Sequence, residues 1–119
     1  MLIIRSPLRI SIGGGGTDIP SYYKEKGSFF ISAAINKYVY VTITKPFVKG
    51  IYLNYSKIER INEIEKIDHK IIKEVLKQEL MENKIEISTL TDIPAKTGLG
   101  SSGSFSTALI KAMYSFNQK

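Results

Sequence analysis

The stretch Pro94-Ala95-Lys96-Thr97-Gly98-Leu99-Gly100-Ser101-Ser102-Gly103 lies between a segment that predicts a strand and one that predicts a helix. Glycines let a main chain approach phosphate oxygens closely, and a helix N-terminus adds unpaired N–H groups and about half a positive charge. Ser101 and Ser102 add hydroxyls that can reach a phosphate oxygen or a magnesium ion. The stretch therefore predicts a phosphate-binding loop. The alternative is a flexible connection in which one of the two serines only caps the helix.

Two other phosphate-binding motifs, the dinucleotide fingerprint and the Walker A loop, fit this stretch less well. The spacing Gly98-x-Gly100-x-x-Gly103 matches the dinucleotide fingerprint, but that fold places its glycine turn after the first strand, with an acidic residue about 20 positions later. Here sheet-rich sequence precedes the glycines and the chain has ended by that distance. A Walker A loop is excluded because no Lys-Ser or Lys-Thr follows the glycines.

The sequence before the loop is rich in strand patterns. Branched and aromatic residues predict two short strands within 2–12 around Pro7, a long strand or bent pair over 29–44, a strand over 51–55, an edge strand over 57–64 and a strand over 84–91. A polar helical turn is expected over 21–26. Sheet-forming segments followed by helices predict an α+β fold, a mixed β-sheet with helices packed on one face.

Two helices are expected from apolar spacing. Asp68 is a candidate N-cap for the first helix, and the apolar face of the second must be buried against another element. The apolar positions of the first are Ile71, Ile72, Val75, Leu76 and Leu80, and those of the second are Phe105, Leu109, Ala112, Met113 and Phe116.

Composition narrows the class of protein. With 119 residues the chain has room for one domain, and without cysteine it has neither disulfides nor thiolate metal sites. No apolar run approaches the ~20 residues that cross a bilayer, so a cytoplasmic protein is expected. The net charge of +6 comes mainly from scattered lysines, which favours a solvated surface. His69 is the single histidine and is expected on a helix surface, which excludes a metal site built from imidazoles.

A second glycine-rich segment lies near the amino terminus. Four glycines, Gly13 to Gly16, precede Thr17 and Asp18, and such a backbone can wrap around a polyhydroxylated ligand while Asp18 accepts hydrogen bonds from its hydroxyls. Arg9 can contact a phosphate. The alternative is a turn in which Asp18 caps the short helix after Pro20.

Both segments resemble one family. Residues 94–103 resemble the central nucleotide loop, P-x-x-x-G-L-G-S-S-A, of the superfamily of galactokinase, homoserine kinase, mevalonate kinase and phosphomevalonate kinase, with Gly103 where alanine is usual. Residues 5–20 resemble the amino-terminal substrate motif of that superfamily. The glycine run, Thr17-Asp18 and residues 20–23 are most similar to D-glycero-D-manno-heptose 7-phosphate kinases. Galactokinases carry Glu-His where this chain has Gly15 and Gly16.

The resemblance implies a fold, a reaction and a set of residues. It implies a fold like the second domain of a small-subunit ribosomal protein. It also implies transfer of the ATP γ-phosphate to the anomeric hydroxyl of heptose 7-phosphate, for surface-polysaccharide and capsule biosynthesis. Arg9 would stabilise charge at the transferred phosphate and Ser102 would touch Mg²⁺. By the same resemblance the ATP-binding residues are Pro94, Lys96, Thr97, Gly98, Leu99, Gly100, Ser101, Ser102 and Gly103, and the sugar-binding residues are Gly14, Gly15, Gly16, Thr17 and Asp18.

The same resemblance implies that residues 1–119 form an amino-terminal domain without its partner lobe. The catalytic base is then expected beyond Lys119, and this chain alone is expected to be inactive. One alternative is a nucleic-acid-binding module of the same fold, which the basic charge and strand tyrosines such as Tyr38 and Tyr40 would fit. Another is a non-catalytic remnant that pairs with a second copy through the apolar face of residues 105–116.

Overall fold

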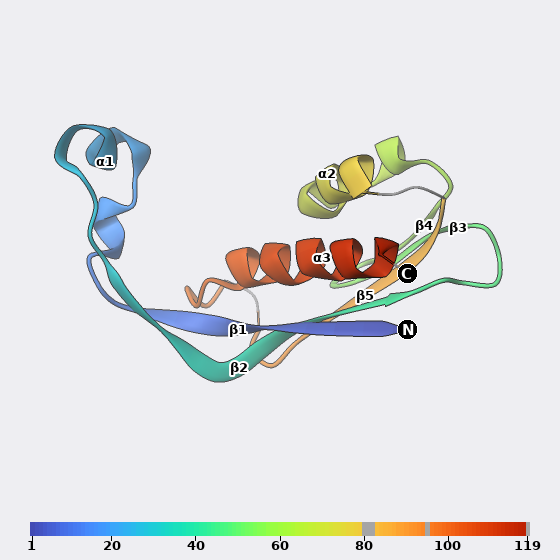
Figure 1. Cartoon of the computed structure of the whole chain (residues 1–119), viewed down its shortest axis with the longest axis horizontal. Helices are drawn as coiled ribbons and strands as arrows, with labels where there is room; N and C mark the ends of the chain where they lie inside the picture. Colours follow the sequence, from blue (N-terminus) through green and yellow to red (C-terminus); the bar gives the residue numbers. More distant parts are fainter. Residues whose placement is uncertain (80–82, 95, 119) are drawn as a thin grey trace.

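The computed structural model describes residues 1–79, 83–94 and 96–118 and contains one five-stranded sheet (Figure 1). The strand order is β1-β2-β5-β3-β4, and every neighbouring pair is antiparallel except β3 with β5, which is parallel. The mixed sheet confirms the predicted fold class. The elements are β1 (Leu2–Gly13), η1 (Gly15–Thr17), α1 (Pro20–Lys26), β2 (Ile31–Thr44), β3 (Gly50–Asn54), β4 (Ile58–Ile61), η2 (Ile64–Lys66), α2 (Lys70–Glu79), β5 (Lys84–Thr91) and α3 (Ser101–Asn117).

Helices α2 and α3 cover one face of the sheet, as predicted (Figure 1). Strand residues alternate between the two faces, so Val39, Val41 and Ile43 of β2 are buried under the helices while Tyr38 and Tyr40 turn to the other face. The core is completed by residues of both helices and the inner strands, namely Ile51, Leu53, Ile72, Leu76, Ile85, Ile87, Ala108, Leu109, Ala112 and Met113.

The expected apolar face of the last helix is buried. Leu109, Ala112 and Met113 are fully enclosed, and Phe105 and Phe116 pack against the same core. This face is therefore not available for pairing with a second copy. The large apolar side chains that α3 exposes are Ile110 and Tyr114. No helix in the described part of the chain is long and apolar enough to span a membrane.

β1 is one strand of 12 residues, which corrects the prediction of two short strands around Pro7. The register shifts between Pro7, which pairs with Tyr38, and Arg9, which pairs with Ala34. Proline has no N–H to donate to a ladder, and an edge strand such as β1 tolerates it. The irregularity turns Leu8 inward, where it is 1% exposed.

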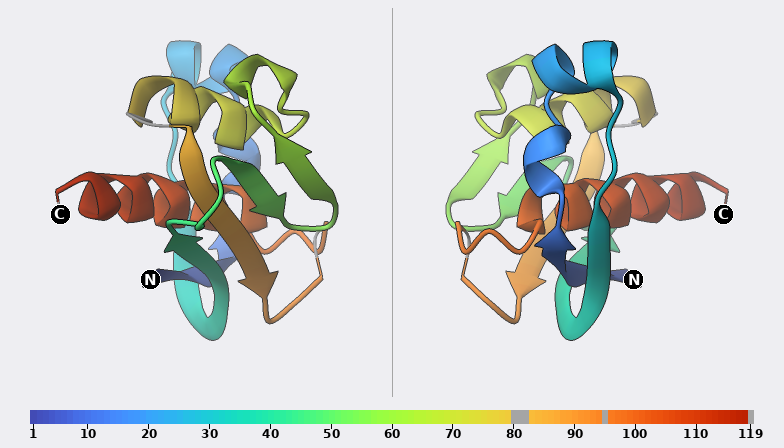
Figure 2. Two further views of the ribbon diagram at one scale, coloured as in Figure 1. Left: turned by 90° about the vertical axis from the view of Figure 1, so that its right-hand side faces the viewer. Right: turned by 90° about the vertical axis from the view of Figure 1, so that its left-hand side faces the viewer.

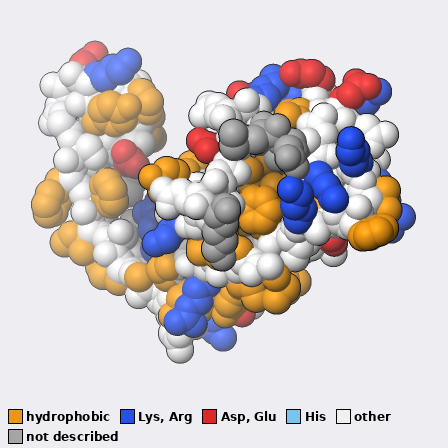
Figure 3. Space-filling model, turned by 45° about the vertical axis from the view of Figure 1, so that its right-hand side comes forward, with side chains coloured by type: hydrophobic (Ala, Val, Ile, Leu, Met, Phe, Trp, Pro, Cys, Tyr) orange, Lys and Arg blue, Asp and Glu red, His pale blue; other side chains and the backbone are white. Residues whose placement is uncertain are grey.

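The outer ends of β1 and β2 form an arm with η1 and α1 at its tip. Figure 2 shows this tip standing beyond the strands, and Figure 3 shows the hollow between it and the body. The longest dimension is 51 Å and the radius of gyration is 16.2 Å. A compact chain of this length would have about 13.5 Å. No residue of α1 is buried. We refer to residues 10–31 as the arm.

The start of α2 differs from the sequence prediction. The helix begins at Lys70, and the imidazole Nδ1 of His69 accepts the N–H of Ile72 at 3.4 Å. Asp68, the expected cap, instead accepts a hydrogen bond from Lys57. His69 is half-buried between Tyr55 and Phe105, with ring centroids 4.9 and 5.3 Å away, and is not a surface helix residue. Leu80, also expected on this helix, lies outside the described residues.

Candidate functional site

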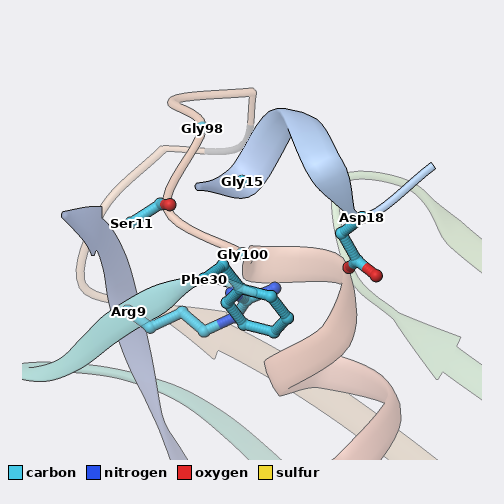
Figure 4. Close-up of a pocket in the computed structure, with 7 residues that line it drawn as sticks. All are labelled: Arg9, Ser11, Gly15, Asp18, Phe30, Gly98 and Gly100. Carbon is cyan, nitrogen blue, oxygen red and sulfur yellow. The ribbon is translucent and has the colours of Figure 1, made fainter. Parts of the chain in front are cut away.

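Both glycine-rich segments line one cavity of about 190 Å³ at the base of the arm (Figure 4). They come from opposite ends of the chain and meet because α3 packs against β1. The arm contributes one wall of the cavity and the loop before α3 contributes another. The lining residues are Arg9, Ser11, Gly15, Asp18, Phe30, Gly98 and Gly100.

The loop before α3 bends through left-handed residues. Gly98 and Gly100 have φ of 73° and 68°, and Lys96 has φ of 68°, a conformation that favours glycine. Gly100 is the N-cap of α3, and no side chain makes a capping hydrogen bond there within the described residues. The alternative in which Ser101 or Ser102 serves only as a cap is therefore not realised. Because Gly100 lines the cavity, the unpaired N–H groups at the start of this 17-residue helix lie next to it.

The glycine run of the arm is held in a tight internal turn. Gly14 has φ of 80°, and a Cβ there would lie 2.2 Å from the Phe29 carbonyl oxygen. The Thr17 hydroxyl donates to the Gly14 carbonyl at 2.7 Å and lies 3.1 Å from Ser28 Oγ. Thr17, expected to bind sugar, thus uses its hydroxyl to close the turn. This closure presents Gly15 and Asp18 to the cavity.

Asp18 lies at the cavity and does not cap the following helix. The N-cap of α1 is Ile19, and that helix has no side-chain cap within the described residues. In Figure 4 the carboxylate of Asp18 stands on the side of the cavity formed by the arm, across from the Arg9 side chain. An anionic acceptor and a cationic donor therefore border one small space, an arrangement suited to a ligand with both hydroxyl and phosphate groups.

Arg9 connects the arm to the loop. Its backbone N–H donates to the Leu99 carbonyl at 3.0 Å. Its side chain crosses Gly100 so closely that a Cβ on that glycine would lie 3.0 Å from Arg9 Cγ and Nε. A side chain at position 100 would therefore require the Arg9 side chain to shift. Glycine at this position serves the approach of Arg9 as well as the left-handed turn.

Two lining residues were missed by sequence reasoning, and several predicted ones lie outside the lining. Ser11 and Phe30 reach the cavity because β1 and β2 pair along the arm. The Phe29-Phe30 pair, directly after the polar residues 24–28, was the available signal in the sequence. Thr97 donates to the Pro94 carbonyl at 3.3 Å within the loop. Predicted site residues outside the lining are Gly14, Gly16, Thr17, Pro94, Lys96, Thr97, Leu99, Ser101, Ser102 and Gly103.

The donors present fit a magnesium ion carried by phosphates. No cluster of three or more His, Cys, Asp or Glu side chains occurs among the described residues, so they form no all-protein cage. Mg²⁺ commonly keeps waters and takes one or two protein oxygens together with substrate phosphates. The exposed side chain of Ser102, in the first turn of α3, offers one such oxygen.

Two sequence comparisons show which known proteins this chain is similar to. Residues 62–119 match the family model for the GHMP kinases N terminal domain. D-glycero-alpha-D-manno-heptose 7-phosphate kinase of Campylobacter jejuni is 28% identical to the chain over 123 residues. That alignment includes 91% of this chain and 35% of the relative, so the chain spans about a third of its length.

Solved structures share the fold of the whole chain. A D-glycero-D-manno-heptose 1-phosphate kinase from Bacteroides thetaiotaomicron superposes with a TM-score of 0.85 at 24% identity, covering 99% of this chain and 43% of that one. The mevalonate kinase of Methanococcus jannaschii superposes with a TM-score of 0.77 at 29% identity, covering 99% and 41%. These likenesses confirm the expected amino-terminal domain fold.

Proposed function

Because the chain is a relative of the GHMP kinases and carries the fold of their amino-terminal domain, we propose that it forms the ATP- and sugar-phosphate-binding part of a cytoplasmic kinase. The proposed acceptor is the anomeric hydroxyl of D-glycero-D-manno-heptose 7-phosphate or a related sugar. The product would enter surface-polysaccharide biosynthesis. The observation that carries the proposal is that Arg9, Asp18 and Gly98 line the same cavity.

The proposed nucleotide site is the loop and the first turn of α3. Residues 96–103 would surround the ATP phosphates, because their glycines admit close backbone approach and the helix end attracts anions. The hydroxyls of Ser101 and Ser102 would donate hydrogen bonds to phosphate oxygens. Bound Mg²⁺ would neutralise charge on the phosphates, and Ser102 is the residue we assign to hold it.

The proposed sugar site is the arm. Asp18 would accept hydrogen bonds from sugar hydroxyls, and the backbone of Gly14 to Gly16 would follow the ring closely. Arg9 lies between the two sites, where it would stabilise the charge of the phosphoryl group in transfer. Asp18 is the only carboxylate among the lining residues of the cavity. By the family resemblance we assign the catalytic base to a residue outside these 119 and expect this chain alone to bind weakly without turnover.

A thermal-shift titration with Mg²⁺ and the non-hydrolysable ATP analogue AMP-PNP tests the nucleotide site. With a Kd of about 1 mM, ligand at ten times that concentration would stabilise the fold by about 1.4 kcal/mol, which corresponds to a rise in Tm of a few degrees. Ser102→Ala should reduce this shift. Ser106→Ala is the matched control, because its hydroxyl bonds within the helix to the Ser102 carbonyl at 2.9 Å. An equal shift in all three proteins, or none at saturating ligand, would reject the nucleotide site.

Mevalonate is the second candidate acceptor, since the mevalonate kinase of Methanococcus jannaschii is 29% identical to this chain. The same titration with heptose 7-phosphate and with mevalonate separates the two acceptors. The charged arm residue Asp18 and the neighbouring Arg9 favour a ligand that carries several hydroxyls and a phosphate. Stabilisation by mevalonate alone would reassign the acceptor while leaving the nucleotide site intact.

A further inference from the structure

The irregular point of β1 is fixed to the nucleotide loop from both sides. The carbonyl of Pro7 accepts a hydrogen bond from the Ser104 hydroxyl at 2.7 Å, and the N–H of Arg9 donates to the Leu99 carbonyl at 3.0 Å. Leu8, between them, is 1% exposed. Two backbone groups that the β1–β2 register shift leaves outside the ladder thus bind the loop and the first turn of α3.

Ser104 is the side chain in this connection. It is 7% exposed, and its own N–H donates to the Gly100 carbonyl at 3.0 Å, so it moves with the first turn of α3. The other buried residues of α3, Ala108, Leu109, Ala112 and Met113, are all apolar. The Ser104 hydroxyl instead satisfies a strand carbonyl that comes from the opposite end of the chain.

The strand beyond this point carries the sugar side of the cavity. Arg9 follows directly, with its side chain against Gly100, and Ser11 and the glycine turn come next. Between the pairs Pro7–Tyr38 and Arg9–Ala34, β1 has one residue, Leu8, and β2 has three, residues 35–37. The regular pairing of the two strands is interrupted at this point, so it constrains the direction of the arm less here than elsewhere. The two hydrogen bonds to the loop and to α3 add a fixed connection at this point.

We propose that Ser104 is a positioning residue: by fixing the Pro7 carbonyl it holds Arg9 and the arm against the nucleotide loop, and so couples nucleotide binding to sugar-phosphate binding. The coupling rests on the proposed function, whereas the connection itself is a property of the fold. A ligand that orders the loop orders the start of α3, and through Ser104 it orders the arm that the second ligand needs.

Hydrogen exchange tests the connection without any ligand. In Ser104→Ala the amide of Arg9 should exchange about tenfold faster, while the amides of Val41 and Ile43 in the core keep their rates. Ser106→Ala, two residues further along α3, removes a hydroxyl that bonds only within the helix, and it should leave the Arg9 amide unchanged. Uniform acceleration of all amides, or no change at Arg9, would overturn the role of Ser104 in positioning.

Paired affinities test the coupling. In the wild-type chain, saturating heptose 7-phosphate should tighten AMP-PNP–Mg²⁺ binding by about fivefold or more, a common size of coupling between sites. In Ser104→Ala this factor should fall toward one, and Ser104→Thr, which keeps the hydroxyl, should restore it. A factor that is unchanged in Ser104→Ala would overturn the coupling. Failure of the wild-type chain to bind either ligand would refute the proposed function. The hydrogen-exchange result at Arg9 would still decide whether Ser104 positions Arg9, because that experiment uses no ligand.

Discussion

At the scale of single residues, Gly14 determines the shape of the arm. Its φ of 80° suits glycine, and a Cβ would lie 2.2 Å from the Phe29 carbonyl oxygen. Alanine in a left-handed conformation costs roughly 1 kcal/mol before any clash is counted. Because a backbone atom is the obstacle, the turn must open for a side chain to fit.

We therefore predict that Gly14→Ala opens the arm locally. The amides of Thr17 and Phe29, which bond to Gly14 O and Thr17 Oγ1, should lose protection from hydrogen exchange, while core amides keep theirs. Gly16→Ala is the control, since nothing lies within 4 Å of its Cβ position, and it should change stability by less than about 0.5 kcal/mol. Equal exchange in the two variants would contradict the described turn.

The residue scale also shows how far the sequence could predict the site. The glycine-serine loop and the glycine run were both recognisable, because their composition is unusual and local. The approach of Arg9 to Gly100, and the presence of Ser11 and Phe30, depend on β1 packing against α3 and pairing with β2. Such contacts between distant segments have no local signal. The site residues assigned by resemblance remain predictions that only ligand binding can test.

At the scale of elements, the entry to α2 depends on a buried carboxylate. Glu59 of β4 is 7% exposed; it accepts a hydrogen bond from the Tyr55 hydroxyl and another from the Asp68 N–H at 3.1 Å. Burial, followed by the hydrogen bond and charge of Glu59, raises the pKa of Tyr55 to about 12. The phenol therefore keeps its proton in the folded chain at a pH where an unfolded chain, with a tyrosine pKa near 10, loses it.

This difference predicts an alkaline loss of stability. Since the folded pKa of Tyr55 is the higher one, its contribution is fully present below about pH 10 and is lost as the pH rises to about 12. Chemical unfolding at a series of pH values should show this decline, and Tyr55→Phe should show a smaller one. When tyrosine ionisation is followed by absorbance, the Tyr55→Phe variant should also lack the tyrosine that ionises near pH 12. The same slope in both proteins would contradict the assignment.

Elements also differ in how well their patterns predicted them. Alternating residues predicted β5 and most of β2, and apolar spacing predicted α3 with its buried face. β1 was divided in the prediction because Pro7 normally interrupts a strand, yet an edge position leaves its missing N–H without consequence. His69, and not Asp68, accepts a hydrogen bond from the start of α2. The Asp68 carboxylate instead accepts a hydrogen bond from Lys57, and the Asp68 N–H donates to Glu59, two residues of the preceding strand region.

At the scale of the whole molecule, the arm and the body form two sides of one site. The body is a core of sheet and two helices, while the arm extends the chain to 51 Å and exposes large apolar side chains such as Ile12, Tyr22 and Phe29. The proposed nucleotide loop belongs to the body and the glycine turn belongs to the arm. In the proposed kinase, the loop would bind the nucleotide and the arm would bind the sugar phosphate.

The open face of the sheet provides the contrast within the same molecule. Tyr38 and Tyr40 lie there with ring centroids 6.1 Å apart, and the Arg5 guanidinium lies 4.5 Å from the Tyr38 ring. A nucleic-acid-binding module of this fold would use such a face. The proposed kinase function assigns no ligand to this face. The two functions therefore predict ligand binding on different surfaces of the chain.

Amide chemical-shift mapping of the labelled chain compares these surfaces directly and detects weak binding. If the chain is the proposed kinase domain, AMP-PNP with Mg²⁺ should shift the amide signals of residues 97–103, and heptose 7-phosphate should shift those of Ser11 and Gly14 to Asp18. The amide signals of Tyr38 and Tyr40 should not shift. Changes confined to the open face of the sheet, or no change at either glycine segment at millimolar ligand, would contradict the proposed kinase function.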